Sequence, residues 1–480
     1  MALVPLLVAL LERPRNWLPS QPARAFALGL IAGAGYFGGT VYWTGSTIRQ
    51  FGGLSWPVAV LVASLLVAYL ALFPGLFALS VGWLISKFGS RGVLLAPAVW
   101  VSTELGRTYF WSGFPWVLLG YSQTTVLPIA QIASVVGVFG VSALVVLVAA
   151  AASYIVSERS FDSVMAAVPV VALVAAIALW GSYRLRHGTV SQQGTPVRVA
   201  LVQGDIPQDE KWDAARANQI FETYLAMTRD AARQGAQLVI WPESATPFYF
   251  EEDRASGDRI RQLVKQTGIE LLFGSDQLEH SNPPLYYNSA FLIRRDGSTA
   301  AVYRKMHLVP FGEYVPLKRL LFFVGTLVEG AGDFTPGQSM VMLPTGFGTI
   351  STAICYEIVY PGLVRRAVLS GSRLLTTITN DAWYGYSSAP YQHFLQASMR
   401  AIEQGRYLAR SANTGISGIV DPYGRVVLQS RIFERVVLVG EVRMLDDRTV
   451  YGKIGDLCAY ICAALTAVAL LAGARLPAVQ

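Results

Sequence analysis

The sequence predicts a helical membrane domain joined to one large water-facing α/β domain. Of its 480 residues, 53% are hydrophobic and only 14% are charged, and the mean hydropathy is +0.42. These values argue against an ordinary soluble globule and against disorder. Residues 1–181 contain eight basic and four acidic side chains, whereas residues 182–455 contain 29 and 26. We therefore expect a transmembrane domain over residues 1–181, a soluble domain over 182–455, and a C-terminal helix and tail over 456–480.

Six apolar stretches are long enough to cross a bilayer, which takes about 20 mostly apolar residues. They are Ala25–Trp43, Pro57–Leu84, Gly92–Phe110, Pro128–Val156, Ser163–Trp180 and Leu457–Ala472. Pro74 and Gly75 lie inside the second stretch, so we expect one tilted or kinked helix there. The apolar segment Ala2–Leu11 is too short to span, and we interpret it as the end of a helix whose beginning this chain lacks.

The basic residues of the short loops predict the orientation of the membrane domain. Loops 12–24, 86–91 and 157–162 carry six Lys and Arg side chains, whereas the alternate loops 44–56 and 111–127 carry only Arg49. The first set should face the cytoplasm. The helix ending near Trp180 then exits on the opposite side, so the soluble domain is expected outside the cytoplasm.

Composition also excludes several classes of function. The net charge of +7 is spread along the chain, and no block of like charge resembles a nucleic-acid-binding surface. A modest positive excess suits a protein beside anionic lipid head groups. Cys458 and Cys462 lie one helical turn apart in an apolar run, Cys355 stands alone, and the four histidines are scattered. This spacing does not predict a zinc site or any other metal site.

Residues 196–445 alternate strand-like and helix-like stretches, which predicts an α/β sheet covered by helices. Strands are predicted over Val197–Gln203, Gln237–Trp241, Glu270–Phe273, Asn288–Ile293, Ala300–Arg304, Thr349–Cys355, Leu374–Ile378, Gly415–Val420 and Val436–Val442. Helices are predicted over Asp213–Arg233, Asp258–Thr267, Leu363–Ser370 and Tyr391–Tyr407. We expect the reactive side chains at strand ends.

Three potentially reactive side chains follow predicted strands. Glu243 follows a strand in the motif WPES, Lys305 leaves a strand and enters a loop with Pro and Gly, and Cys355 ends an apolar strand. Taken singly, each has an ordinary interpretation: a solvated glutamate, a surface lysine and a small buried cysteine.

Together the three residue types supply what acyl transfer needs. A thiol becomes a useful nucleophile when a base or a positive charge favours its thiolate. A carboxylate can take the thiol proton and later give it to a leaving group. A lysine ammonium can stabilise the oxyanion of a tetrahedral intermediate, beside the backbone N–H that follows the nucleophile. The chain contains no G-x-S-x-G motif, which disfavours a serine hydrolase of that type.

The motifs around these residues resemble those of the nitrilase superfamily. They are WPES at 241–244, the block K-x-H-L-V-P-F-G-E-x-V-P that starts at Lys305, and CYE at 355–357. Further blocks are QGDIPQ at 203–208, KW at 211–212, NDAWYG at 380–385, and GFPW with GYSQ at 113–123. With these, nearly the whole chain resembles the apolipoprotein N-acyltransferase family, bacterial inner-membrane enzymes that complete lipoprotein maturation.

This resemblance implies an α-β-β-α sandwich, no cofactor and a two-step reaction. Cys355 would attack the sn-1 ester of a phospholipid, with phosphatidylethanolamine as the expected donor, and a thioester would form. The α-amino group of the diacylglyceryl-cysteine of an apolipoprotein would then accept the acyl chain. Glu243 would be the general base and acid, and Lys305 would stabilise the oxyanion.

The resemblance also implies supporting residues and a location. Glu313 would hold the geometry of the site, with Tyr356 and Glu357 lining the turn of the nucleophile. The catalytic domain would lie on the periplasmic side of the inner membrane, in a monomer that binds no nucleic acid. The family has eight membrane helices, whereas this sequence predicts six and a fragment, so we expect the first family helix to be missing.

Access of lipid to the site is a separate expectation. Leu317–Val328 combines basic and apolar residues in a pattern typical of a segment lying at a membrane interface, although a buried core helix would also explain it. We interpret this segment as a mobile arm over the nucleophile and expect Phe322 and Phe323, together with Trp212 and Trp383, to line the substrate entrance.

Two other functions remain open at this level. A membrane-tethered nitrilase-type amidase acting on a small soluble amide would use the same three residues, with water as the acceptor. A non-enzymatic lipid or lipoprotein carrier would not need all three, so their presence disfavours it.

Overall fold

The chain divides into two units, each with its own hydrophobic core. The computed structural model describes residues 3–12, 21–310, 312–314 and 334–476. One unit comprises Met1–Ser46, Ser55–His187 and Lys453–Gln480, and the other comprises Thr47–Leu54 and Gly188–Gly452. The short segment Thr47–Leu54 therefore packs with the second unit although its neighbours in sequence belong to the first.

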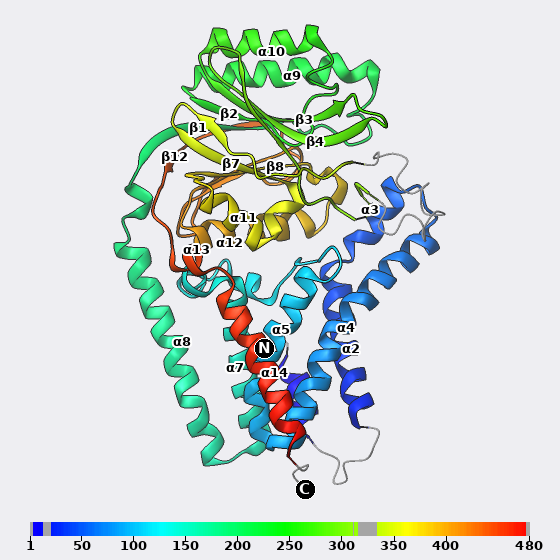
Figure 1. The fold of residues 1–480 in the computed structure, drawn as a ribbon, viewed down its shortest axis with the longest axis vertical. Coiled ribbons are helices and arrows are strands. Elements are labelled where there is room, and N and C mark those ends of the chain that lie inside the picture. Colours follow the sequence, from blue (N-terminus) through cyan, green and yellow to red (C-terminus); the bar gives the residue numbers. More distant parts are fainter. Residues whose placement is uncertain (1–2, 13–20, 311, 315–333, 477–480) are drawn as a thin grey trace. The chain divides into compact units, whose positions relative to one another are not determined.

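The first unit is helical (Figure 1). Its helices are α1 (Val4–Leu11), α2 (Gln21–Thr40), α3 (Trp43–Phe51, whose end lies in the second unit), α4 (Trp56–Phe88), α5 (Ala96–Tyr109), α6 (Leu127–Ala130), α7 (Ala133–Glu158), α8 (Phe161–His187) and α14 (Leu457–Ala474). Among the described residues, four helices are long and apolar enough to cross a membrane: α4, α7, α8 and α14. The pair α2 and α3, bent by 56°, would make a fifth if it is one span.

Two predicted spans differ from the helices observed. The stretch Gly92–Phe110 does not form one long helix, because a 3₁₀ turn (Ser90–Leu95) precedes the 14-residue α5. Pro97 in the first turn of α5 has no N–H to donate to a preceding turn, so it favours a helix start. The stretch Pro128–Val156 is divided between α6 and α7. By contrast, α4 runs without a break through Pro74.

The second unit is a sandwich of two sheets, each with six strands among the described residues. One sheet has the order β12-β1-β2-β3-β4-β5, and the other has the order β11-β10-β9-β8-β7-β6. The strands of the first are β1 (Thr195–Gln203), β2 (Leu238–Ile240), β3 (Glu270–Glu279), β4 (Leu285–Ile293), β5 (Thr299–Arg304) and β12 (Val436–Met444). Those of the second are β6 (Leu343–Thr345), β7 (Gly348–Ile354), β8 (Leu375–Thr379), β9 (Leu408–Ala412), β10 (Gly418–Val420) and β11 (Val426–Gln429). In each sheet three central strands are parallel and the outer ones pair antiparallel.

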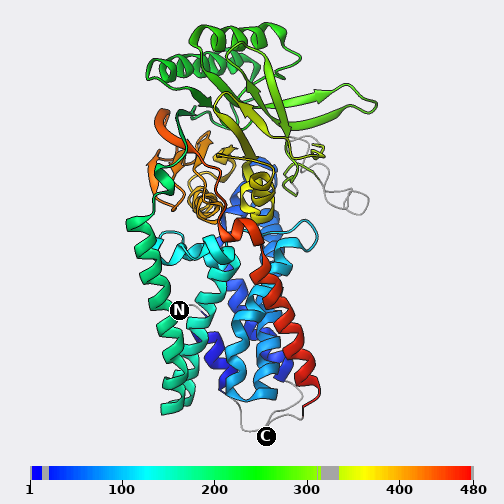
Figure 2. The ribbon, with the colours of Figure 1, turned by 60° about the vertical axis from the view of Figure 1, so that its left-hand side comes forward.

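Helices cover the outer face of each sheet, which gives the α-β-β-α order that the resemblance implied. Helices α9 (Ala214–Arg233) and α10 (Arg254–Thr267) lie over the first sheet, and α11 (Pro361–Leu369) and α12 (Ala389–Gln404) lie against the second (Figures 1 and 2). The short helix α13 (Val450–Ile454) follows β12. The central parallel strands are apolar on both faces because both faces are buried. For example, Val239 packs towards α9 and α10, whereas Ile240 packs between the sheets.

All nine predicted strands are present, with ends shifted by up to six residues, and three others were missed: β6, β9 and β11. The helix predicted to reach Tyr407 ends at Gln404, because Gly405 has φ +61° and caps it in the left-handed conformation. β9 then begins at Leu408. Its buried polar residues Arg410 and Ser411 hid the strand from a hydrophobicity pattern.

Candidate active site

The ends of three strands bring Glu243, Lys305 and Cys355 together. Glu243 lies three residues after β2, Lys305 directly follows β5, and Cys355 directly follows β7. All three are buried, with relative exposures of 6%, 1% and 5%. The Nζ atom of Lys305 lies 3.3 Å from Oε1 of Glu243, and the charges of both residues act on the Cys355 thiol. The site predicted from separate motifs is thus one cluster in space.

Lys305 is held between two carboxylates. Its Nζ atom donates to Oε1 of Glu313 at 2.8 Å, and the side-chain amide of Asn288 donates to Oε1 of both Glu243 (2.7 Å) and Glu313 (3.0 Å). The other Glu313 oxygen accepts the Val309 N–H at 2.8 Å. Burial opposes the ammonium charge, but Glu313 and Glu243 outweigh this effect and raise the pKa of Lys305. The lysine is therefore a permanent cation, as an oxyanion stabiliser must be.

Glu243 is ionised in this setting. Burial alone would raise its pKa, but Lys305, the Asn288 amide, Lys211 and the Asn380 N–H together hold the pKa below its usual value. The Asn380 N–H donates to Oε2 at 2.8 Å. The buried Lys211 donates to the backbone carbonyl of Glu243 at 3.1 Å. Each carboxylate oxygen thus has a donor, and the residue is ready to accept a proton.

Cys355 is a neutral thiol in the resting site. Burial and the nearby charge of Glu243 raise the pKa of its thiol, and Lys305 offsets this only in part. The residue has φ +52°, a left-handed conformation that costs a non-glycine residue about 1–2 kcal/mol. Such strain at the end of a strand is typical of a nucleophile held in a sharp turn.

The raised thiol pKa predicts how Cys355 reacts with a small alkylating agent. The rate constant for iodoacetamide should keep rising from pH 6 to pH 9, because the reactive thiolate fraction keeps growing below the pKa. The measurement is mass spectrometry of the alkylated Cys355 peptide over a pH series. A plateau already reached near neutral pH would show a thiolate at rest and would contradict this description.

Glu357 joins the loops that carry the lysine and the cysteine. Its Oε1 atom accepts hydrogen bonds from the Met306 N–H (2.7 Å), the His307 N–H (3.1 Å) and the Tyr303 hydroxyl (2.8 Å). Its Oε2 atom accepts from the Ile354 N–H at 2.8 Å. This fully buried side chain therefore fixes the residues next to Lys305 relative to those next to Cys355.

The other predicted site residues lie in different surroundings. Tyr356 is buried and packs edge-on against Tyr360, with ring centroids 5.3 Å apart. Trp212 is 49% exposed on the turn that follows Pro207. Phe322, Phe323 and the whole of the proposed arm Leu317–Val328 lie outside the described residues.

Trp383 is held by the segment Thr47–Leu54. The Thr47 hydroxyl donates to the Trp383 carbonyl at 2.9 Å, and the Phe51 ring meets the indole edge-on with centroids 4.8 Å apart. Sequence reasoning placed Thr47 and Phe51 in a loop of the membrane domain and did not connect them with the catalytic residues.

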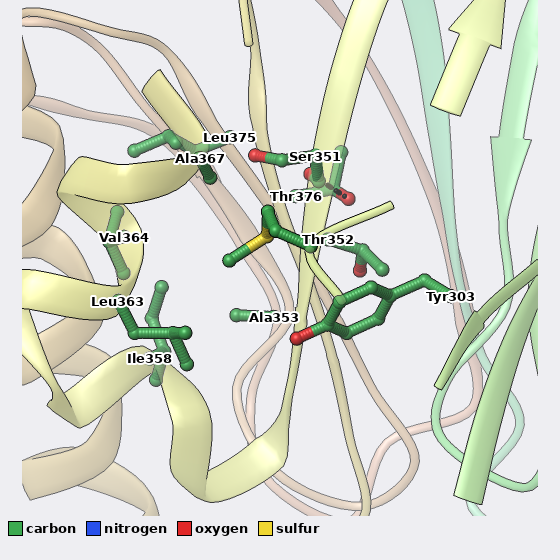
Figure 3. Close-up of a pocket in the computed structure, with 11 residues that line it drawn as sticks. Tyr303, Ser351, Thr352, Ala353, Ile358, Leu363, Val364, Ala367, Leu375 and Thr376 are labelled. Atoms are coloured by element: carbon green, nitrogen blue, oxygen red, sulfur yellow. Dashed lines mark hydrogen bonds between the residues drawn. The ribbon is translucent and has the colours of Figure 1, made fainter. Parts of the chain in front are cut away.

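A small apolar cavity lies beside β7, the strand that precedes Cys355 (Figure 3). Ser351 and Ala353 of β7, Leu363 of α11 and the Tyr303 ring line it. Glu243, Lys305 and Cys355 are not among the lining residues. The cavity therefore belongs to the packing around β7 and not to the cluster of reactive groups.

Sequence reasoning missed several polar neighbours of the three reactive residues. Asn288 was placed in a strand without a role, although an amide in an apolar strand is a signal of a buried hydrogen bond. Asn380 and Lys211 stood in motifs that carried the resemblance, but no role was given to them. Asn380 acts through its backbone N–H, which side-chain patterns cannot reveal.

Comparison with known proteins identifies the family. A model described as carbon-nitrogen hydrolase matches residues 198–447, and one described as the apolipoprotein N-acyltransferase N-terminal domain matches residues 1–151. The apolipoprotein N-acyltransferase of Geobacter metallireducens is 40% identical over 460 residues, which cover 93% of this chain and 87% of the relative. That of Methylococcus capsulatus is 36% identical over 477 residues, covering 97% and 90%.

Among solved structures, a mutant of the Nesterenkonia AN1 amidase from the nitrilase superfamily is 22% identical, covers 56% of this chain and 98% of that chain, and has a TM-score of 0.43. The two curated relatives span nearly the whole chain, and the two family models match its N-terminal and sandwich segments. The chain belongs to the apolipoprotein N-acyltransferase family of the nitrilase superfamily, membrane enzymes that carry out the N-acylation of lipoproteins.

Proposed function

We propose that the enzyme transfers an acyl chain from a phospholipid, through a thioester on Cys355, to the α-amino group of the diacylglyceryl-cysteine at the N-terminus of an apolipoprotein. The observation that carries this proposal is the buried cluster of Glu243, Lys305 and Cys355, with the lysine 3.3 Å from the glutamate. Phosphatidylethanolamine is the proposed donor, and its sn-1 ester is the proposed target.

The first half-reaction needs one proton transfer in each direction. Glu243 takes the Cys355 proton as the sulfur attacks the ester carbonyl, and the Lys305 ammonium and the Tyr356 N–H stabilise the oxyanion. When the intermediate collapses, the C–O bond breaks and Glu243 returns the proton to the leaving lysophospholipid oxygen. The acyl chain remains on sulfur as a thioester.

The second half-reaction reverses these roles. The α-amine of the acceptor attacks the thioester carbonyl, Glu243 takes a proton from the nitrogen, and the C–S bond breaks as the thiol regains a proton. Because the donor leaves before the acceptor reacts, the scheme is ping-pong. Glu313 supports it by pairing with Lys305, and Trp212 and Trp383 are proposed to contact entering substrate.

The catalytic segment, residues 182–455, is proposed to face the periplasm. The support is the loop charge, with six basic residues in one set of short loops and Arg49 alone in the other. The side also depends on the number of membrane crossings before residue 182, and in this number α5 and the 3₁₀ turn before it count as one crossing. The segments that precede and follow it in the sequence, residues 1–181 and 456–480, are the proposed membrane segments.

An amidase acting on a small soluble amide would use the same three residues. The match of residues 1–151 to the N-terminal domain of apolipoprotein N-acyltransferases favours the acyltransferase. The carrier alternative does not explain a buried Glu–Lys pair beside a thiol.

Incubation of the detergent-solubilised enzyme with phosphatidylethanolamine labelled in its sn-1 chain tests the proposal. We expect the protein to become labelled. Hydroxylamine should remove this label, since it cleaves thioesters, and a diacylglyceryl-cysteine peptide should accept the labelled acyl chain from the protein. Cys355→Ala is the control and should carry no label. Absence of label from the wild type would reject the thioester route.

Glu243→Gln should lower the rate of acyl-enzyme formation by at least about 10²-fold, because the amide cannot accept the thiol proton. The amide keeps the shape of the side chain and a carbonyl oxygen that can still accept from the Asn288 amide. Its NH2 group would face the Asn380 N–H, and Lys305 would keep only Glu313 as its counter-ion, so we expect a lower melting temperature in a variant that still folds at the assay temperature. The measurement is single-turnover labelling beside thermal unfolding. A wild-type labelling rate would remove Glu243 from the mechanism.

A further inference from the structure

A second buried polar cluster lies directly behind the nucleophile, and no step of the mechanism above uses it. It consists of Asp381, His393 and Arg410, whose side chains are fully buried. Nε2 of His393 lies 3.1 Å from the backbone carbonyl oxygen of Cys355, and Nδ1 lies 3.1 Å from Oδ1 of Asp381. The other Asp381 oxygen pairs with Arg410 at 2.8 Å.

The partners of His393 determine which ring nitrogen carries the proton. A carbonyl oxygen can only accept a hydrogen bond, so Nε2 must be the donor to Cys355. Nη2 of Arg410 lies 3.1 Å from Nδ1 and can donate to it. Burial, followed by the charge of Arg410, lowers the pKa of His393, which agrees with a neutral ring protonated at Nε2.

The ring cannot turn away from this carbonyl without breaking buried pairs. Asp381 accepts from Arg410 and from the Thr379 hydroxyl at 2.9 Å, and Nε of Arg410 donates to the Ile416 carbonyl at 3.1 Å. The aromatic ring of Tyr384 meets the imidazole edge-on, with centroids 6.5 Å apart. Unlike the histidine of a catalytic aspartate–histidine pair, His393 in this form has no proton on Nδ1 to donate to Asp381, and its Nε2 proton goes to the backbone carbonyl of Cys355 and not to the sulfur.

Fixing the Cys355 carbonyl also fixes the N–H of the next residue. The peptide unit between Cys355 and Tyr356 is planar, so its carbonyl and its N–H point in opposite directions as a rigid body. Cys355 is held at φ +52°, a conformation that needs support from its surroundings. A rotation of this peptide unit would carry the Tyr356 N–H out of line with the oxyanion.

We propose that His393 is a positioning residue, which orients the Cys355–Tyr356 peptide unit so that the Tyr356 N–H points at the oxyanion of the tetrahedral intermediate. The inference rests on the proposed role of Cys355 as the nucleophile. It assigns a function in the reaction to a histidine that sequence reasoning counted only among scattered histidines.

Two reactions of the same thiol separate this role from simple packing. Acylation by a phospholipid ester passes through an oxyanion, whereas alkylation by iodoacetamide is a direct displacement with no oxyanion. Three variants of the full-length enzyme provide the comparison. The His393→Gln amide nitrogen can occupy the place of Nε2, His393→Asn reaches only the place of Nδ1, and His393→Leu has no donor.

We expect His393→Asn and His393→Leu to lower the single-turnover acylation rate by about 10²-fold, the lower end of the effect of losing one oxyanion donor. His393→Gln should recover most of the loss. Alkylation of Cys355 should stay within a few-fold of wild type in all three. Because Asn and Gln are both polar, their comparison holds even if His393→Leu fails to fold.

Three results would overturn the inference. They are wild-type acylation in His393→Asn, equal losses in His393→Gln and His393→Asn, and parallel losses of acylation and alkylation. The last would mean that His393 places the sulfur and not the N–H. Failure of the proposed function is distinguishable, because then the wild type itself would form no thioester at Cys355, whatever the residue at 393.

Discussion

Replacement of Cys355 by serine is expected to abolish acyl transfer, with residual activity below about 10⁻⁴ of wild type. A hydroxyl ionises far less readily than a thiol, and the base beside it is a carboxylate whose pKa the site lowers, so it is too weak to activate an alcohol. The hydroxyl is also smaller than the thiol, so the fold should be unaffected. The measurement is transfer of labelled acyl chain to a diacylglyceryl-cysteine peptide, with the melting temperature as a check.

The chain contains its own controls for this prediction. Cys458 and Cys462 lie on α14, which belongs to the helical unit, whereas the strand ends that carry Glu243, Lys305 and Cys355 belong to the other unit. Changing either to alanine should leave transfer within a few-fold of wild type. If one of them proved essential while Cys355→Ala remained active, the nucleophile would have been placed on the wrong cysteine.

The proximity of Glu243, Lys305 and Cys355 could be predicted because each comes shortly after a strand, and strand periodicity is readable from sequence. The same argument explains why the sandwich was predicted well and the membrane helices less well. Hydropathy does not show where a helix breaks, so the 3₁₀ turn before α5 was read as part of a continuous span. Strand β9 was missed for the opposite reason, because buried Arg410 pairs with Asp381 and makes a core strand look polar.

What the sequence could not supply was the set of contacts between segments far apart in the chain. His393 lies 38 residues after Cys355, and Thr47 lies 336 residues before Trp383. The contact that His393 makes is to a backbone atom, so no pattern of side-chain types marks it. Asn288 was equally hidden, since its role depends on both Glu243 and Glu313 lying within reach of one amide.

Lys305→Met should have the second large effect, on both activity and stability. The acylation rate should fall by about 10³-fold, the upper end for loss of one oxyanion donor, since this donor is also charged. The free energy of unfolding should fall by about 3–5 kcal/mol, because the buried Glu243 and the partly buried Glu313 would be left without their shared cation. Single-turnover labelling and chemical unfolding give the two values. Lys265→Met, at an exposed position on α10, is the control and should change neither.

The pH dependence of stability distinguishes this account from a simple loss of packing. In the wild type the pKa of Glu243 is lowered by folding, so its contribution is present at neutral pH and is lost as the pH falls through the folded pKa. Without Lys305, the largest effect that opposes burial is gone, so burial should raise the pKa of Glu243 above its value in the unfolded chain. The folded variant then binds an extra proton, so its stability is lost as the pH rises. Lys305→Met should therefore be closest to wild type in stability near pH 5 and furthest from it near pH 8.

Removing the Glu313 carboxylate together with the Lys305 ammonium provides the decisive comparison. In the double variant Lys305→Met/Glu313→Gln, Glu243 keeps its charge while Lys305 and Glu313 lose theirs, and Asn288 can still donate to Glu243 at the 2.7 Å contact. We expect it to recover part of the lost stability, because the repulsion between the carboxylates is gone, and to keep part of the pH dependence, because Glu243 is still buried without Lys305. Acylation should stay as low as in Lys305→Met, since no cation faces the oxyanion. A recovery of activity along with stability would mean that Lys305 acts by holding the two carboxylates together and not by its charge on the intermediate.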